Sequence, residues 1–278
     1  MKGGRDRDEI KRAAKLLKEA GSIIFLCGAG MGVDSGIEPK DGYGLEGHSP
    51  YHMSKYSTLC NEPHLFWGYQ VQRARAFKQA TPHIGYNLLK EMMLVKTAIF
   101  TSNIDEHCAR VFQEDKYNLL ECHGSIGFVQ TFEHNGKIWK TIEEDVNAKV
   151  DQYTGNAKTL PNRAGMAIRF NVLYIGDEDF CRQRLNYQEK RFHFAVSDMQ
   201  KAVIIEIGAG TGIPTVRRKS GELSQKLDAP VIRINLDQPD LYIPNIDTLP
   251  KREDHVSIGG MGAKEALEQI YLEWKILK

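Results

Sequence analysis

Residues 25–37 read Phe-Leu-Cys-Gly-Ala-Gly-Met-Gly-Val-Asp-Ser-Gly-Ile. An apolar run that ends in alternate glycines is typical of a buried strand that turns tightly into a helix. Glycine permits positive backbone angles and close approaches, and the N–H groups at the start of a helix can face a phosphate. The segment therefore predicts a strand, a turn and a nucleotide site, although ordinary connectors can carry the same pattern.

The residues that follow exclude a dehydrogenase-type site. Such a site requires an acidic residue at the end of a second strand, about 20 positions after the glycines. Residues 38–61 instead contain three glycines and two prolines with little periodicity. They predict a long loop, and a long loop in a compact domain is more often functional than idle.

The composition limits the partners of the chain. The 278 residues carry 37 Lys and Arg against 36 Asp and Glu, so there is no overall field to attract nucleic acid or an acidic membrane. No apolar run approaches the about 18 residues that span a bilayer, and the charged first residues lack the apolar centre of a signal peptide. Five scattered cysteines without a C-x-x-C pair indicate reduced thiols. We expect a cytoplasmic protein with no nucleic-acid or membrane partner and no bound zinc.

Strands alternate with helices along most of the chain, which predicts a doubly wound, Rossmann-like α/β fold with a parallel sheet. Residues 124–170 interrupt this rhythm with two short strand patterns around an Asn135-Gly136 turn, so a small hairpin-centred module is expected there. The large domain would comprise 1–125 and 171–278, and the small module 126–170 with parts of the 38–62 loop region. The predicted strands are 23–27, 98–101, 119–122, 171–175, 202–207 and 231–236, and the predicted helices are 8–20, 63–79, 82–94, one from about 105, 182–200, 214–227 and 262–277.

Polar residues and glycines follow several of these strands. They are Ser102–Asp105, His123, residues 208–212, and Asn235 with Asp237. The carboxyl ends of parallel strands share one rim, so these groups should converge on a site suited to a ribose, a pyrophosphate and a proton-transfer group. Each also has a structural reading: Asn103 and Asp105 as helix caps, His123 as a turn residue and residues 208–212 as a tight turn. Because all these groups occur together in one chain, the nucleotide site is favoured over the separate structural readings.

The motifs together resemble those of one family, the sirtuins, which are Sir2-like NAD-dependent enzymes. The resemblance covers roughly residues 8–125 and 171–277 and is closest to a bacterial Sir2 subgroup. The matching motifs, in order and spacing, are Gly28-Ala29-Gly30 with Ser35-Gly36-Ile37, Thr101-Ser102-Asn103-Ile104-Asp105, Glu121-Cys122-His123-Gly124-Ser125, Ile207-Gly208-Ala209-Gly210-Thr211 and Arg233-Ile234-Asn235.

The resemblance implies a sirtuin-like NAD-binding architecture and a protein deacylase that cleaves nicotinamide from NAD and transfers the acyl group to ADP-ribose. His123 would be the general base, with Asn103 and Asp105 as catalytic partners near the nicotinamide ribose. The segment at 171–177 would receive an acyl-lysine peptide as an added strand through Val172, Leu173, Tyr174 and Gly176. The implied NAD-binding residues are Gly28, Ala29, Gly30, Met31, Asp34, Ser35, Ser102, Asn103, Ile104, Asp105, Gly208, Ala209, Gly210, Thr211, Asn235 and Ile258.

Two departures from the family leave alternatives open. Sirtuins place Pro-Asp-Phe-Arg where this chain has Glu38-Pro39-Lys40-Asp41, and the nearest aromatic residue is Tyr43. If Tyr43 does not shield the reactive ribose, NAD hydrolysis or ADP-ribosyl transfer would compete with deacylation. Sirtuins also hold zinc on two cysteine pairs in the small module, whereas residues 124–180 contain no cysteine. The module would then depend on apolar contacts, for which the candidates are Phe128, Phe132, Ile138 and Trp139.

Three functions therefore remain. The first is an NAD-dependent deacylase, the second an ADP-ribosyltransferase or NAD hydrolase, and the third a non-catalytic binder of NAD or ADP-ribose. The expected partner is an acylated or ADP-ribosylated protein. His123 counts against the third function, because a binding module needs no general base. The aromatic residues of helix 63–79 would serve core packing or face the cleft or a partner subunit.

Overall fold

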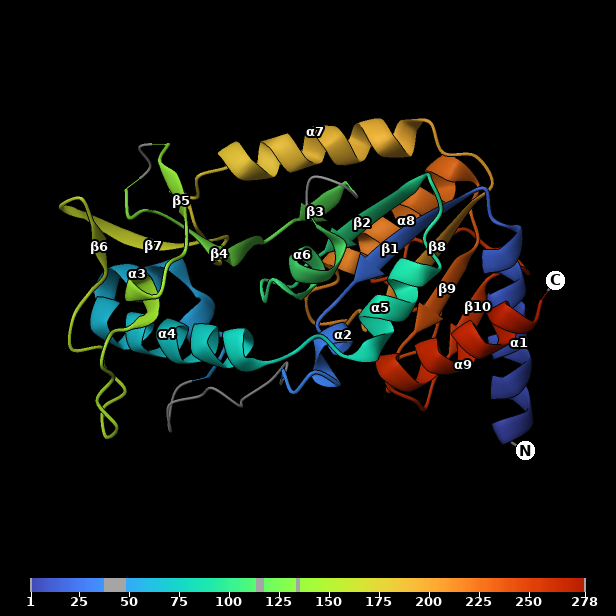
Figure 1. Ribbon diagram of the computed structural model, residues 1–278, viewed down its shortest axis with the longest axis horizontal. Helices are drawn as coiled ribbons and strands as arrows, with labels where there is room; N and C mark the ends of the chain where they lie inside the picture. Colours follow the sequence, from blue (N-terminus) through green and yellow to red (C-terminus); the bar gives the residue numbers. More distant parts are fainter. Residues whose placement is uncertain (1, 38–48, 114–117, 134–135, 278) are drawn as a thin grey trace.

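A computed structural model describes residues 2–37, 49–113, 118–133 and 136–277 (Figure 1). Its larger sheet has six parallel strands in the order β3-β2-β1-β8-β9-β10. Two halves of three strands thus meet between β1 and β8, which is the doubly wound arrangement that the sequence predicted. The strands are β1 (Ser22–Cys27), β2 (Thr97–Thr101), β3 (Leu119–Glu121), β8 (Ala202–Ile207), β9 (Val231–Ile234) and β10 (Val256–Ile258).

Successive residues of β1 enter two different cores, since side chains alternate across a sheet. Phe25 and Cys27 join one core, and Ile24 and Leu26 join the other. Helices therefore cover both faces of the sheet, as a parallel sheet requires (Figure 1). The first face is covered by α1 (Lys2–Glu19), α5 (Ile84–Glu91), α6 (His107–Phe112) and α9 (Ala263–Ile276), and the second by α7 (Gln183–Ser197) and α8 (Thr215–Leu227).

A separate antiparallel sheet has the strand order β5-β4-β7-β6. It packs on α3 (Tyr56–Asn61) and α4 (Pro63–Gln79) around a third core, at the left of Figure 1. Trp67 is 1% exposed and stacks on Phe170 with 4.8 Å between ring centroids. Core packing of the α4 aromatics is thus confirmed. The strands are β4 (Gly124–Thr131), β5 (Ile138–Lys140), β6 (Asn162–Arg163) and β7 (Met166–Val172).

Charged groups as well as apolar ones hold this smaller sheet. Phe132 and Trp139 pack against the third core as predicted. The guanidinium of Arg163 forms an ion pair with the buried Asp145 and lies 5.7 Å from the centre of the Trp139 ring. Among the described residues, no group of three or more His, Cys, Asp or Glu could hold a metal ion. The expectation that zinc is not bound stays a prediction, as does the division into domains.

The observed elements differ from the predicted ones at several ends. Strand β7 spans Met166–Val172 rather than 171–175, because the chain leaves the sheet there and Ile175 instead bridges Lys55. Helix α3 lies within the region predicted as loop, and β10 was not predicted. Elements of three to six residues contain too little periodicity to be recognised. The predicted hairpin is confirmed as β4 and β5, although Asn135 lies outside the described residues.

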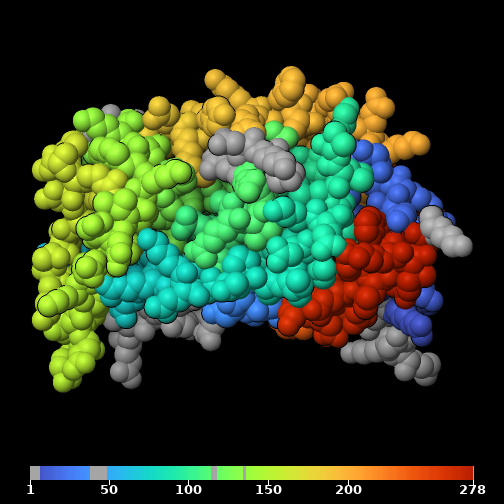
Figure 2. Space-filling model, viewed as in Figure 1, coloured from blue at the N-terminus to red at the C-terminus, as the bar shows by residue number. Residues whose placement is uncertain are grey.

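Helix α7 lies along the top of the face shown in Figure 2, between the small sheet and the end that carries α1. Arg184 at its start forms an ion pair with Glu121, and its guanidinium lies 4.1 Å from the centre of the Phe128 ring. The helix therefore links β3 of the parallel sheet to β4 of the small sheet. Within the described ranges, no helix is long and apolar enough to span a bilayer.

Candidate functional site

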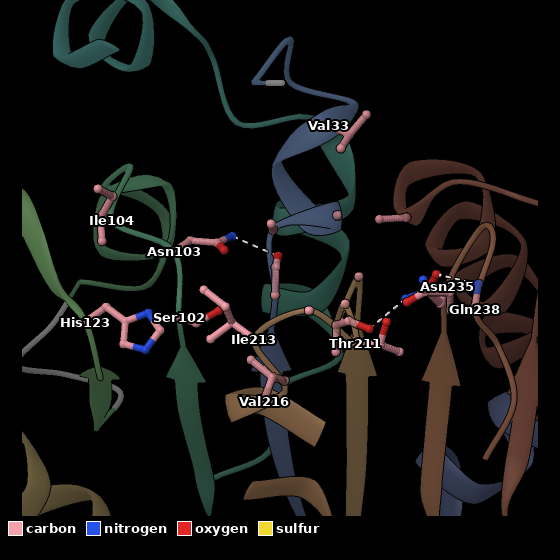
Figure 3. A pocket seen from close by; sticks show the side chains of 18 of the residues that line it. Val33, Ser102, Asn103, Ile104, His123, Thr211, Ile213, Val216, Asn235 and Gln238 are labelled. Carbon is pink, nitrogen blue, oxygen red and sulfur yellow. Dashed lines mark hydrogen bonds between the residues drawn. The ribbon is translucent and has the colours of Figure 1, made fainter. Parts of the chain in front are cut away.

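A cavity of about 1280 Å³ opens where the parallel strands end. Its walls come from the turns after β1 and β8, the ends of β2, β3 and β9, and residues 172–175 beside β7 (Figure 3). It includes the point between β1 and β8 at which the strand order changes direction, and open α/β sheets bind ligands at such a point. The predicted site residues that line it are Gly28, Ala29, Gly30, Asp34, Ser102, Asn103, Ile104, His123, Val172, Leu173, Tyr174, Gly208, Ala209, Gly210, Thr211 and Asn235.

The two glycine turns pack directly against each other. A Cβ on Gly28 would lie 2.6 Å from the carbonyl oxygen of Gly208, and a Cβ on Gly30 would lie 2.7 Å from the Gly208 Cα. Gly208 itself has a φ of +62°, which glycine adopts without strain. The glycines are therefore required for the contact between the turns.

Two backbone N–H groups that the sequence predicted to face a phosphate are instead bonded within the protein. The Gly28 N–H donates to the Ile207 carbonyl at 2.8 Å, and the Gly30 N–H donates to the Gly208 carbonyl at 3.0 Å. Ala29 and residues 209–213 donate no backbone N–H to any other described residue. The free donors at the cavity thus come mainly from the turn after β8, and not from the start of α2 (Gly30–Val33).

Two asparagines fix the turns and face the cavity (Figure 3). Asn103 donates from Nδ2 to the Gly28 carbonyl at 2.9 Å. Asn235 donates from Nδ2 to the Ala209 carbonyl at 2.9 Å, and its Oδ1 accepts from the Gln238 N–H at 3.0 Å. The end of each strand is therefore locked to a neighbouring turn.

His123 follows β3 and lies on the cavity wall near Ser102 (Figure 3). Burial lowers the pKa of this imidazole from 6.5, and a hydrogen bond with the Ser102 backbone opposes that effect. The ring is consequently neutral at pH 7 and can accept a proton.

Asp105 does not line the cavity. It is 4% exposed, and its Oδ1 accepts from the His107 N–H at 2.9 Å. The bond satisfies the N–H of the first residue of α6, although the N-cap position of that helix is Glu106 and not Asp105. Burial raises the pKa of Asp105 to about 6.

Four other predicted site residues also lie off the cavity wall. Met31 is buried in the first core, and its carbonyl accepts from His83 Nε2 at 2.9 Å. The Ser35 hydroxyl accepts from the His83 N–H at 3.0 Å. Ile258 is buried in β10, and Gly176 follows the lining segment with a φ of +74°. Ligand contact at these four positions stays a prediction, and Tyr43 lies outside the described residues.

The fold adds lining residues that the sequence did not indicate. Arg73 comes from α4, and its Nε is buried without a hydrogen-bond partner among the described residues. Ile213 and Val216 form an apolar wall near Ser102 (Figure 3). No local pattern marks these positions, because distant elements bring them to the rim. The others are Val33, Ser54, Ile175, Ile234, Leu236, Gln238, Gly262 and Ala263.

The segment after β7 is already paired on one edge. The Leu173 N–H donates to the His123 carbonyl at 2.9 Å. Ile175 donates to the Ser54 carbonyl at 2.9 Å and accepts from the Tyr56 N–H at 2.9 Å. Beneath it, Arg169 makes two bonds to the Asp177 carboxylate, at 2.6 and 2.9 Å, with both side chains fully buried.

The strand order and the cavity at the crossover define a doubly wound α/β protein with a small second sheet beside its ligand crevice. No family model matches the chain. The chain is 29% identical over 146 residues to NAD-dependent protein deacylase 2 of Archaeoglobus fulgidus, a match that covers 50% of this chain and 56% of that protein. It is 26% identical to the NAD-dependent protein deacylase of Corynebacterium glutamicum, over 81% of this chain and 84% of that protein.

A crystal structure of a Sir2 homologue in complex with NAD has the same fold. Its TM-score is 0.65 at 18% identity, over 95% of this chain and 93% of that one. The chain spans little more than half the length of the archaeal relative. Taken together, these likenesses confirm the resemblance to the sirtuin, or Sir2, family that the motifs indicated.

Proposed function

We propose that this chain is an NAD-dependent protein deacylase that cleaves nicotinamide from NAD and transfers an acyl group from lysine to ADP-ribose. One observation carries the proposal. A single cavity brings the neutral imidazole of His123 together with Asn103, the two glycine turns and the 172–175 segment. The names of the relatives, both NAD-dependent protein deacylases, support the same reaction.

The residues at the cavity fit NAD. The N–H groups of Ala29 and residues 209–213 have no partner in the described part of the chain and can bind a pyrophosphate. A Cβ on Gly210 or Gly212 would meet no described atom within 4 Å. Asn235, Thr211, Ser102 and Asn103 line the cavity. In this proposal the first two contact one ribose, and the last two contact the nicotinamide ribose. When bound, NAD supplies a glycosidic bond that breaks with release of nicotinamide.

His123 performs the proton transfer in this proposal. Its neutral ring accepts a proton from a ribose hydroxyl and holds it as imidazolium, so that the hydroxyl oxygen can react with the transferred acyl group. The apolar wall of Ile104, Ile213 and Val216 keeps water from part of this space.

The acyl-lysine peptide is proposed to bind at Val172, Leu173, Tyr174 and Gly176. The backbone of Leu173 and Ile175 is already bonded to His123 and to residues 54–56. Successive residues of a strand direct their backbone groups to opposite edges, so an added peptide strand would use the edge of Val172. At Tyr174 the N–H donates to the Asp177 carboxylate at 3.4 Å and the carbonyl accepts from the Asp177 N–H at 3.2 Å, so pairing there would require these bonds to open.

Product analysis tests the function. Purified protein is incubated with NAD, with and without acetyl-lysine peptides, and nicotinamide, ADP-ribose and O-acetyl-ADP-ribose are separated. Peptide-dependent O-acetyl-ADP-ribose is the expected result. Free ADP-ribose without peptide would replace the deacylase with a hydrolase, and modified protein would replace it with an ADP-ribosyltransferase.

The second candidate, an NAD hydrolase or ADP-ribosyltransferase, is favoured by the sequence at 38–41, where the aromatic residue of the sirtuin loop is absent. A non-catalytic binder of NAD or ADP-ribose is disfavoured because His123 lies on the cavity wall. A cytoplasmic location and an acylated or ADP-ribosylated protein partner belong to the same proposal.

A further inference from the structure

Four charged side chains are buried together behind the wall of the cavity. Glu206 lies on β8, Arg233 on β9, Arg217 on α8, and Asp247 in the loop between β9 and β10. Their side chains are 0–1% exposed. Two cations and two anions balance in charge, as buried ions must.

Arg233 is bonded mainly to the acidic partners, and its Nη1 also donates to the Asp240 carbonyl at 2.5 Å. Its Nε and Nη2 donate to the two oxygens of Glu206 at 2.5 and 3.0 Å, and Nη2 also donates to Asp247 at 2.7 Å. This pair joins β8 to β9 side by side, and it holds Asp247 in place for the second arginine.

Arg217 directs its donors to main-chain carbonyls instead. Nε donates to the Ala209 carbonyl at 3.0 Å, and Nη2 donates to the Gln238 carbonyl at 2.5 Å. Nη1 donates to the Asp240 carbonyl at 3.3 Å and to Asp247 at 3.2 Å. Ala209 and Gln238 both line the cavity. The Arg217 guanidinium therefore joins the turn at 209–213 to the segment at 235–240, and it does so beside the neutral bond from Asn235 Nδ2 to the Ala209 carbonyl.

A buried ion pair is weak support for stability, because its desolvation offsets most of its attraction. Its geometry is better suited to fixing positions. Most of the cavity N–H groups that lack a partner among the described residues belong to the turn at 209–213, and Arg217 is the one charged anchor of that turn among those residues. We infer that Arg217 is a positioning residue for the nucleotide, acting through the Ala209 and Gln238 carbonyls. The inference rests on the proposed function, in which that turn binds the pyrophosphate.

The test substitutes Arg217→Lys and measures binding of ADP-ribose by calorimetry. A lysine keeps the charge but cannot reach three carbonyls in a fixed fork. Affinity for ADP-ribose is expected to fall about tenfold or more, since the displaced N–H groups of residues 209–213 can no longer bind the pyrophosphate at the same time. The KM for NAD should rise while kcat at saturation changes less. Amide hydrogen exchange of residues 209–213 should become faster in the ligand-free variant.

Arg169→Lys is the matched control. Arg169 is equally buried and is also paired with a carboxylate, but that partner is Asp177 beside the proposed peptide segment. Its substitution should leave the affinity for ADP-ribose unchanged and raise the KM for the acyl peptide. If Arg217→Lys does not fold, the charge-balanced double variant Arg217→Met with Asp247→Asn carries the same prediction.

The possible outcomes separate the two claims. If the wild-type chain binds neither NAD nor ADP-ribose, the proposed function fails, and the inference fails with it. If wild type binds but folded Arg217 variants bind as tightly with unchanged exchange at 209–213, only the inference is overturned. An equal loss of affinity in Arg169→Lys would also overturn it, because any buried pair would then have the same effect.

Discussion

At the scale of single residues, His123 separates binding from turnover. Its imidazole lines the cavity but makes no contact that the glycine turns require. Replacement His123→Ala should therefore abolish turnover while ADP-ribose binds with an affinity close to that of wild type. Steady-state rates and calorimetry on the same preparations check this. A His123→Ala variant with full activity would remove the residue from the mechanism.

The pH profile gives a second check on His123. Burial lowers the pKa of the ring from 6.5, so the ring becomes half protonated only at a pH below that value. The value of kcat/KM should be constant through neutral pH and fall on the acid side, with an apparent pKa below 6.5. An acid limb centred above this value would contradict a buried neutral base.

Asp105 affects stability through its protonation. Its pKa is about 6 in the folded chain against 3.8 when exposed. A raised pKa means that the protonated carboxyl stabilises the folded chain relative to the unfolded one. This stabilisation is complete below pH 3.8 and is lost as the pH rises through about 6. Asp105→Asn removes this loss and keeps an acceptor for the His107 N–H. Relative to wild type, the variant should gain about 2–3 kcal/mol between pH 4 and pH 7.

Urea unfolding of both proteins at the two pH values measures that gain. Titrations elsewhere in the chain cancel in the difference between the proteins. A difference in free energy of unfolding that does not change with pH would show that Asp105 titrates normally.

At the scale of elements, the contact between the two glycine turns leaves no room for a side chain. A Cβ on Gly208 would lie 2.4 Å from the Gly30 Cα, and the φ of Gly208 is +62°. Gly208→Ala should destabilise the protein by more than about 2 kcal/mol. Gly212→Ala is the control, because a Cβ there meets nothing within 4 Å, and its stability should change by less than about 0.5 kcal/mol.

Thermal and urea unfolding of the two variants make the comparison. Equal stability of Gly208→Ala and Gly212→Ala would mean that the turns can separate without cost.

The sequence predicted most of the larger elements, because their signals are local. Helix α4 and strand β8 have the predicted bounds, 63–79 and 202–207, since a long periodic pattern and a continuous apolar run define them. Strand β10 was missed because three residues after a loop rich in proline and aspartate carry no pattern. Tertiary pairing also moved the end of β7, where Ile175 pairs with residues 54–56 in place of β4.

The cavity was predictable where its residues follow strands, as Asn103, His123 and Asn235 do. It was not predictable where long-range packing decides the outcome. The Gly28 and Gly30 N–H groups bond to the turn after β8, and Asp105 turns inward beneath α2. Arg73 reaches the wall from α4, and Arg217 acts from behind it. Contacts between elements distant in sequence leave no local signal.

At the scale of the whole molecule, the smaller sheet is expected to be stable without metal. Its core is built around Trp67 and Phe170, and the Arg163–Asp145 pair links its strands to the loop that follows β5. Excess EDTA should therefore leave the thermal unfolding midpoint unchanged. Trp67→Ala is the positive control and should cost about 3–5 kcal/mol. A fall in the midpoint with EDTA, reversed by zinc, would contradict the prediction.

The two sheets contribute different sides of one cavity, and the central claim is that this arrangement couples NAD cleavage to an acyl peptide. The most direct measurement is the rate of nicotinamide release from NAD with and without acetyl-lysine peptide, in wild type and His123→Ala. We expect release that requires both the peptide and His123. Release that is independent of the peptide, or no release from a protein that binds ADP-ribose, would contradict the account.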